Sequence, residues 1–596
     1  MSIMDLKGIK NNPKRNGFDL SERVAFTAKV GELLPIVTKE VLPGDKFKIN
    51  IKAFSRTVPL NTAAYTTIRE YYDVFFVPNR LIWNRFDQFI TQMPNNQHSS
   101  GFGANDFGTI TQQPYFDFDD IIRTLYTIST EESGFATSIF GQNKAKLSAK
   151  LLNYLGYGNI QHYLDNWTSE YPNNTQYTYN PAINPFPLCA YQKIYQDFYR
   201  NNQWEESNPQ CYNFDFVSQS TNKYLSSYNA YDTGMFDLRY ANYKKDLFTG
   251  LMPNAQFSPT ASFATIASTN GELPYRFARN GDQSLADADR GNLKMYNGLL
   301  QNSDGVNRSE NIDTLRIYTE QLGRLSVIAL RQAEAMQKWN EISQANKYDY
   351  KHQLEAHWGV KVSNSRSGLC EYLGGTSSTL DIDGVDNTNI TARDDNGTQI
   401  NKAVVAGKGI GANSGFVDFE AQEHGILMVI YHAIPELDYV NYGISPLNTK
   451  TKPTDYAIPE LDSIGMQEVP LIQLTNDERL FSNYANGPYP MKSIGFAPRY
   501  YDYKTAVDTI KGAFMETYSD WVSPMTRDYI YNYLINTYTE TTGSYLTYTF
   551  FKVNPNILFP IIGEEATNDV STDHLLINSS FDIKAVRNLD YNGLPY

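Results

Sequence analysis

The 596-residue sequence contains little cysteine, a small share of charged residues and no long apolar run. Its three cysteines, Cys189, Cys211 and Cys370, form no CxxC pair, which excludes a disulfide-built scaffold and a cysteine-ligated zinc ribbon. Apolar runs such as 425–430 are far shorter than the roughly 18 residues of a membrane-spanning helix. The polar stretch 1–29 lacks the apolar segment of a secretory signal. We therefore expect no membrane insertion and synthesis in a reducing cytoplasm.

Positive charge is also in deficit, with 51 Lys and Arg against 65 Asp and Glu, a net charge of −14. Dedicated nucleic-acid binders are normally basic, so any contact with nucleic acid has to be local. The candidate residues are Lys7, Lys10, Lys14 and Arg15, in a stretch whose single acid is Asp5. Such an arm can neutralise phosphates, or it can be a solubilising tail, and the sequence favours neither.

Aromatic side chains, by contrast, are abundant. They make up 14% of the chain and include 44 tyrosines. Aromatic residues favour strands and the cores of protein–protein interfaces. The composition therefore indicates a β-rich protein with large interfaces rather than a metabolic enzyme.

Alternation with period two predicts strands near both ends of the chain. Phe47, Ile49, Ile51 and Ala53 fall on one face of the first strand, opposite the lysine ladder Lys46, Lys48 and Lys52. This ladder is more typical of a solvated strand face than of a nucleic-acid contact. The run 425–435 is apolar throughout, as in a strand buried on both faces, and 575–586 and 545–550 alternate.

The middle of the chain differs from the two ends. The segment 314–346 is the clearest helix, with an apolar stripe that includes Met336, Trp339 and Ile342. The polar segment 254–311 predicts an elaborate loop region, and loops of this length are often functional. The order of strands, long insertion and strands favours one β domain with insertions over several separate domains.

Three motifs resemble reactive sites, but their spacing is wrong. His352 and His357 are five residues apart, not the four of a zinc-protease helix that would use Glu355 as its base. The glycine-rich segment 407–415 lacks phosphate-loop spacing, and 381–387 lacks the EF-hand spacing, so both favour turns between strands. An adventitious calcium site at 381–387 stays open. We expect no catalytic residue, metal ligand or cofactor.

Several segments, in order along nearly the whole chain, resemble one family, the major capsid proteins of microviruses (Microviridae), small icosahedral phages with circular single-stranded DNA. Their sequences are FDLS at 18–21, EVLPGD at 40–45, FFVPNRLIW at 75–83, LLNYLG at 151–156, YQKIYQDFYR at 191–200, KDLFT at 245–249, EYLGG at 371–375, EHG at 423–425 and NGLPY at 592–596. The pattern is most similar to the gokushovirus-like branch, in which a large insertion decorates the shell.

The resemblance implies a single eight-stranded antiparallel jelly-roll β-sandwich with large helical and loop insertions. The expected parts are an N-terminal arm (1–30), the first strands (31–78), interstrand insertions (79–350, with 254–311 as a candidate surface protrusion) and the remaining strands with a C-terminal tail (351–596).

The implied function is a non-enzymatic structural protein of the virion that forms a T=1 icosahedral shell of sixty copies in the bacterial cytoplasm. The implied partners are the single-stranded DNA genome, a small basic DNA-packaging protein, scaffolding and pilot proteins, and a bacterial surface receptor. Two other classes compatible with the composition are a carbohydrate-binding or carbohydrate-active β-sandwich and a phage receptor-binding protein.

Overall fold

The computed structural model divides the chain into two compact units, Met1–Ala255 with Ser363–Tyr596 (unit 1) and Gln256–Val362 (unit 2). The residues that it describes are 15–58, 60, 65–92, 112–130, 137–167, 180–216, 225–255, 275–279, 294–296, 299–301, 307–311, 315–319, 327–347, 349–363, 367–386, 406–440, 442–477, 493–533, 546–561 and 573–591.

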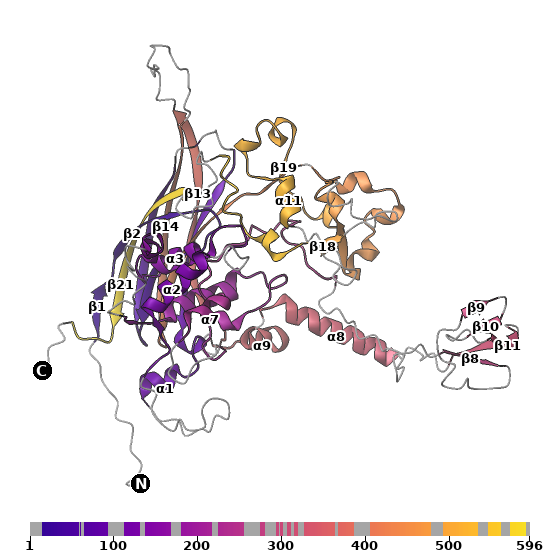
Figure 1. Ribbon diagram of the computed structural model, residues 1–596, viewed down its shortest axis with the longest axis horizontal. Helices are drawn as coiled ribbons and strands as arrows, with labels where there is room; N and C mark the ends of the chain where they lie inside the picture. The colour runs from indigo at the N-terminus through magenta and orange to yellow at the C-terminus, as the bar shows by residue number, and fades with distance from the viewer. Residues whose placement is uncertain are drawn as a thin grey trace, which may run out of the picture. The chain divides into compact units, whose positions relative to one another are not determined.

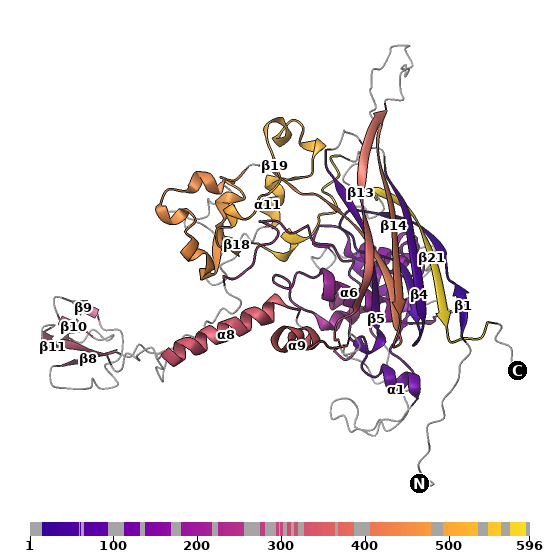
Figure 2. The ribbon, with the colours of Figure 1, turned by 180° about the vertical axis from the view of Figure 1, so that it is seen from behind.

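Unit 1 is built on an antiparallel sheet of nine strands within the described residues, so the protein is mainly β as expected. The strand order is β1-β21-β4-β14-β13-β5-β15-β3, and β2 also pairs with β21. The strands are β1 (Asn16–Asp19), β2 (Glu22–Ala28), β3 (Leu34–Val41), β4 (Lys46–Thr57), β5 (Ile68–Pro78), β13 (Glu371–Asp386), β14 (Ala406–Glu420), β15 (Gly425–Pro435) and β21 (Leu575–Arg587). Figure 2 shows β13, β14, β4 and β21 running side by side, and Figure 1 shows β13, β14 and β21 from the opposite side.

The sheet separates into two rows because β13 and β14 pair only at one end. Residues 381–386 of β13 pair with 406–410 of β14, whereas 371–380 pair with β5 and 410–420 of β14 pair with β4. We call β2, β21, β4 and β14 the β21 row, and β3, β15, β5 and β13 the β15 row.

The inner faces of the two rows pack against each other. The hydroxyl of Tyr72 in the β15 row lies 3.0 Å from that of Ser579 in the β21 row. The rings of Phe26 and Tyr431, again from opposite rows, have centroids 5.1 Å apart. These side chains belong to the large buried core of unit 1.

The outer faces of the rows differ. Along β21, buried and exposed residues alternate. Leu575, Ile577, Phe581 and Ile583 are on the buried side, which confirms the predicted alternation. In β15 nearly every residue is buried, as predicted for 425–435. The second face of β15 and β5 is covered by α6 (Phe186–Ile194), which Figure 2 draws on the side away from β21.

The helices of unit 1 lie mainly in the insertion between β5 and β13. Helices α2, α3 and α4 contact one another, and α3 also contacts β3. With α6, the α-helices among the described residues of this unit are α1 (Phe86–Thr91), α2 (Phe118–Ser129), α3 (Lys144–Tyr154), α4 (Ile160–Asp165), α7 (Ser227–Asp232) and α11 (Arg527–Tyr533). Among the described helices, none has the length and apolarity required to cross a membrane.

Short strands complete unit 1. They are β6 (Phe116–Asp117), β7 (Ala182–Ile183), β16 (Asp438–Val440), β17 (Met466–Pro470), β18 (Ser493–Pro498), β19 (Thr509–Ile510) and β20 (Pro524–Met525). The strand predicted at 545–550 is wrong, because Tyr548–Phe551 forms a 3-10 helix. Phe550 and Phe551, adjacent in sequence, are both buried, which a single strand face would not allow.

In its described residues, unit 2 has small sheets and two helices. Its elements are β8 (Tyr275–Arg279), β9 (Lys294–Tyr296), β10 (Leu299–Gln301), β11 (Asn307–Asn311), β12 (Leu315–Thr319), α8 (Val327–Ala345) and α9 (Tyr350–Trp358). The helix predicted over 314–346 is wrong at its start, because β12 pairs with β8 and α8 begins at Val327. The predicted apolar stripe is not a core face, since Met336 and Trp339 are each 54% exposed.

Candidate nucleic-acid and inter-subunit surfaces

The zinc-like motif of α9 does not converge on one point. The Nδ1 atom of His352 lies 3.3 Å from a carboxylate oxygen of Asp349, and Nε2 of His357 lies 2.9 Å from the hydroxyl of Ser343. Throughout the described part of the chain, no three His, Cys, Asp or Glu side chains are grouped so that they could hold a metal ion.

The two segments predicted as turns are strands instead. Residues 407–415 lie inside β14, and 381–386 form the end of β13, whose side chains are outside the described residues, as is Asn387. Glycine is needed in β14 for close approach between the rows. A Cβ atom at Gly411 would lie 2.7 Å from a carboxylate oxygen of Glu70 on β5, and one at Gly415 would lie 2.6 Å from Thr376 on β13.

The reactive side chains of the core are protected by burial. All three cysteines are buried, and burial raises the pKa of Cys211 to about 11 and that of Cys189 and Cys370 well above the usual thiol value. Because the thiolate is the nucleophilic form, these thiols are unreactive near neutral pH. Burial likewise raises the pKa of Glu70, which lies between the rows and accepts hydrogen bonds from Ser55 and Tyr431.

Of the four predicted DNA-contacting residues, only Arg15 is described. Its Nη2 donates a 2.7 Å hydrogen bond to the carbonyl oxygen of Gly44, in the turn before β4. Lys7, Lys10 and Lys14 lie outside the described residues. Arg15 therefore lies beside the turn that precedes β4, directly before β1 begins at Asn16.

The lysine ladder lies on the outer face of the β21 row, as its periodicity predicted. Two of its three members face acids: Lys46 forms a 2.8 Å ion pair with Glu420, and Lys48 stands in register with Asp418. Lys52 stands between Ser580 and Ser414 and has no such neighbour. Acidic neighbours therefore balance the lysine charge at the Lys46 end of the ladder, whereas the charge at the Lys52 end is not balanced.

Sequence reasoning missed two residues next to Lys52. Phe54 and Arg56 follow it on the same exposed face, and the Arg56 guanidinium carbon lies 4.8 Å from the centroid of the Phe54 ring. The signal was present, because the alternation that places Lys52 on the outer face places residues 54 and 56 there as well.

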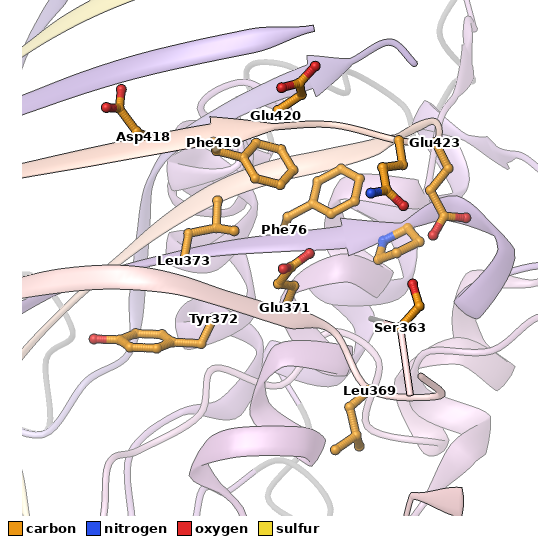
Figure 3. A pocket seen from close by; sticks show the side chains of 12 residues that line it. Phe76, Ser363, Leu369, Glu371, Tyr372, Leu373, Asp418, Phe419, Glu420 and Glu423 are labelled. Atoms are coloured by element: carbon orange, nitrogen blue, oxygen red, sulfur yellow. The ribbon is translucent and has the colours of Figure 1, made fainter. Parts of the chain in front are cut away.

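A cavity of about 400 Å³ opens where β13 and β14 separate. Figure 3 shows the rings of Phe76 and Phe419 side by side, and their centroids are 4.8 Å apart. Four acidic residues line the cavity: Glu371, Asp418, Glu420 and Glu423. Glu423 accepts a 2.8 Å bond from Arg80 and Glu420 pairs with Lys46, so part of this acidic charge is neutralised within the chain.

Large apolar side chains are exposed at many places on the chain. The most exposed are Tyr350 and Leu447, each 73% exposed, followed by Tyr591, Tyr65 and Trp358. Single exposed apolar residues are normal, but aromatic residues and depletion of charge are typical of surfaces buried by association. The described part of the chain thus combines a buried core with many exposed apolar side chains.

Comparison with known proteins agrees with this picture. The model of the family described as "Capsid protein (F protein)" matches residues 8–120 and 164–529. The chain is 21% identical over 555 residues to "Capsid protein VP1" of Chlamydia phage 1, covering 84% of each chain. It is 23% identical over 521 residues to "Capsid protein VP1" of Bdellovibrio phage phiMH2K, covering 85% of this chain and 83% of that one.

These matches confirm the resemblance to the major capsid proteins of microviruses that the ordered segments indicated. They also account for the many exposed apolar side chains of the described residues. The chain belongs to the phage capsid protein (F protein) family and is a structural major capsid protein.

Proposed function

We propose that the two rows form a single jelly roll and that the chain assembles into a T=1 icosahedral shell around a circular single-stranded DNA genome. The observation that carries the proposal is the strand order. The rows read β2-β21-β4-β14 and β3-β15-β5-β13, so that β2, β3, β4 and β5 alternate between rows, as in a Greek-key double sheet. This arrangement leaves long connections free to form contacts around symmetry axes.

Assembly depends on many weak, symmetric contacts. Closed symmetry repeats each contact, and several contacts per subunit act together, so a moderate energy at each one stabilises the shell. The exposed side chains of Tyr65 and Leu447 are of the kind that such contacts bury.

Expression of the full chain followed by electron microscopy and mass measurement tests the proposal. We expect closed particles of one diameter with sixty copies. Leu447→Asp should reduce assembly and leave the unfolding temperature of the free subunit unchanged. Trimers or fibres would instead indicate a receptor-binding protein, and a small oligomer with activity on glycans would indicate the carbohydrate-active alternative.

The N-terminal arm is proposed to bind the genome through Lys7, Lys10, Lys14 and Arg15. An acidic shell protein needs local cations to hold an anionic polymer. The triple variant Lys7→Gln/Lys10→Gln/Lys14→Gln should lower packaged DNA and weaken its dependence on salt. Arg15→Gln is made as a separate variant, because Arg15 also donates a hydrogen bond to the carbonyl oxygen of Gly44. Unchanged DNA content in the triple variant would assign the arm to subunit contacts.

Segment 254–311 is proposed to form a surface protrusion that contributes to host attachment. Residues 256–311 of it belong to unit 2, which is a compact unit of its own. Its six acids and five bases nearly balance, so it lacks the basic excess of a DNA-facing loop. Deletion of 281–305 should leave shells that no longer attach to host cells. Loss of assembly would make the segment an inter-subunit clamp.

The remaining partners are proposed on the family resemblance. They are a small basic DNA-packaging protein, scaffolding and pilot proteins and a bacterial surface receptor, with assembly in the host cytoplasm and the virion as destination. We also propose that the protein has no catalytic turnover, because its histidine motif is spread over separate partners and its cysteines are buried.

A further inference from the structure

The outer face of the β21 row has one end with an unbalanced positive charge. Lys52 and Arg56 form no ion pair with a described side chain, and their register neighbours on β21 are Ser580 and Leu576. Arg23 of β2, close by, donates a 2.8 Å hydrogen bond to the Asn578 side chain. In a chain with a net charge of −14, three exposed cations without an acidic partner favour an anionic ligand.

The acids nearest this end are already paired. Asp573 bonds to Lys150 at 2.8 Å, and its side chain is almost fully buried. Asp582, further along β21, pairs with Lys584 at 3.2 Å. The positive charge of the end therefore stays uncompensated within the described part of the chain.

An aromatic ring lies between the cations. Phe54 occupies the position between Lys52 and Arg56 on the same strand face and is 39% exposed. A cavity of about 450 Å³ opens beside it, lined by Ala25, Thr27, Leu576 and Asn578 among others. An exposed ring with apolar walls and an amide group can accept a flat heterocycle, stack on it and form hydrogen bonds to its edge.

The spacing along β4 suits a polynucleotide. The Cα atoms of residues 52 and 56 are about 13 Å apart in an extended strand, which suits contacts with different phosphates. The Arg56 guanidinium lies 4.8 Å from the centroid of the Phe54 ring and takes one face of it, so a base would stack on the other face. An aromatic platform on a sheet, flanked by cations, is a general solution for binding unpaired bases. Duplex DNA hides its base faces and would use only the cations.

We propose that the outer face of the β21 row at Lys52, Phe54, Arg56 and Arg23 binds single-stranded DNA, with a base stacked on Phe54 and phosphates at the cations. The proposal rests on the proposed enclosure of such a genome and specifies which surface contacts it. The other occupant to test is a second protein chain. The three clustered cations favour nucleic acid, because a protein partner would need an acidic surface to match them.

Binding of a fluorescent oligo-dT to unassembled full-length subunits tests the site. These subunits also carry Lys7→Gln/Lys10→Gln/Lys14→Gln, so that the lysines of the arm do not contribute. Phe54→Ala should weaken binding about 10-fold without changing its salt dependence. Lys52→Gln/Arg56→Gln should reduce the slope of log K against log salt by about 1.4, since each phosphate contact with a single strand contributes about 0.7. Phe54→Trp should restore binding, and a duplex should bind more weakly.

Matched controls lie on the same face. Lys46→Gln/Lys48→Gln removes two cations from the balanced end, and Phe416→Ala removes a ring that is 62% exposed on β14. Both should bind like the parent. Equal losses in patch and control variants, or no loss with Phe54→Ala, would overturn the proposal.

Three further outcomes separate this inference from the proposed function. If polyglutamate displaces all of the oligo-dT and Phe54→Ala does not change oligo-dT binding, the partner is an acidic protein and the DNA site is wrong. If the patch variants bind oligo-dT normally but fail to form shells, the face is a subunit contact and the DNA site is again wrong. If the parent chain forms no shells at all, the proposed function fails, while the binding result still decides the site.

Discussion

The two strand rows of unit 1 share one inner core but differ on their outer faces. In the β15 row, Phe75 packs outward against Phe198, with ring centroids 5.1 Å apart, and Asp73 accepts a 2.6 Å hydrogen bond from Tyr199. In the β21 row the corresponding outward positions are Lys52, Phe54 and Arg56, which are exposed. The covered row stabilises the subunit, whereas the uncovered row offers a surface to partners.

The largest difference is expected from removing one aromatic ring on each outer face. Phe75→Ala should lower the free energy of unfolding by about 3–5 kcal/mol, because it leaves a cavity between β5 and the segment after α6. Phe54→Ala should change it by less than about 1 kcal/mol, since that ring is partly solvated. Urea unfolding of free subunits measures both values, and equal losses would contradict the comparison.

A buried cluster of one lysine and two acids should stabilise the subunit nearly as much as Phe75 does. Lys150 of α3 bonds to Glu32 at 2.7 Å and to Asp573 at 2.8 Å, and all three side chains are largely buried. Lys150→Met removes the cation that both buried carboxylates contact and should cost about 3–5 kcal/mol.

Lys46→Met is the matched change on the free face, where Lys46 and Glu420 are both half exposed. It should cost less than about 1 kcal/mol. The two unfolding midpoints in urea provide the test, and a large loss in the surface variant would show that the free face also stabilises the subunit.

Acid should destabilise the covered face through His432. This side chain is stacked on Tyr71, contacts Tyr199 and lies 3.7 Å from Asp73, and burial lowers its pKa from 6.5 to about 4. The unfolded chain takes up a proton below pH 6.5 and the folded chain only near pH 4, so stability falls as the pH drops between these values. The loss is as much as about 3 kcal/mol.

His432→Phe should remove part of this dependence in melting curves recorded at pH 7 and pH 5. His574 should keep part of the pH dependence in this variant, because burial lowers its pKa to about 4 as well. Glu70 acts in the opposite direction, because its raised pKa contributes stability that is lost as the pH rises. An unchanged difference between the two pH values in the variant would contradict the assignment to His432.

The smallest effect is expected on α9, which belongs to unit 2. His352→Ala/Glu355→Ala/His357→Ala should leave particle formation intact and shift subunit stability by about 1 kcal/mol or less, because these side chains are only partly buried. Particle yield and infectivity provide the measurement. A defined turnover that disappears in this variant would contradict a purely structural role.

Local pattern was reliable where one periodicity covered a whole strand. The alternation at 575–586 and the apolar run at 425–435 each predicted a strand and its burial correctly. Pattern failed where partners far along the chain decided the structure. Glycines at 407–415 indicated a turn, yet they serve a strand that must pass close to Ser55 and Thr376. Residues 315–319 fitted a helix but pair with β8.

The candidate surface shows the same division. Periodicity alone placed Lys46, Lys48 and Lys52 on one solvent-facing side, and the sequence alone predicted a β-rich, non-enzymatic shell protein by composition and by ordered family segments. Register decided the rest, because only the pairing of β4 with β14 and β21 shows that acids face Lys46 and Lys48 while Lys52 faces serines. Charge balance is a property of neighbours across strands, so tertiary structure was needed to determine it.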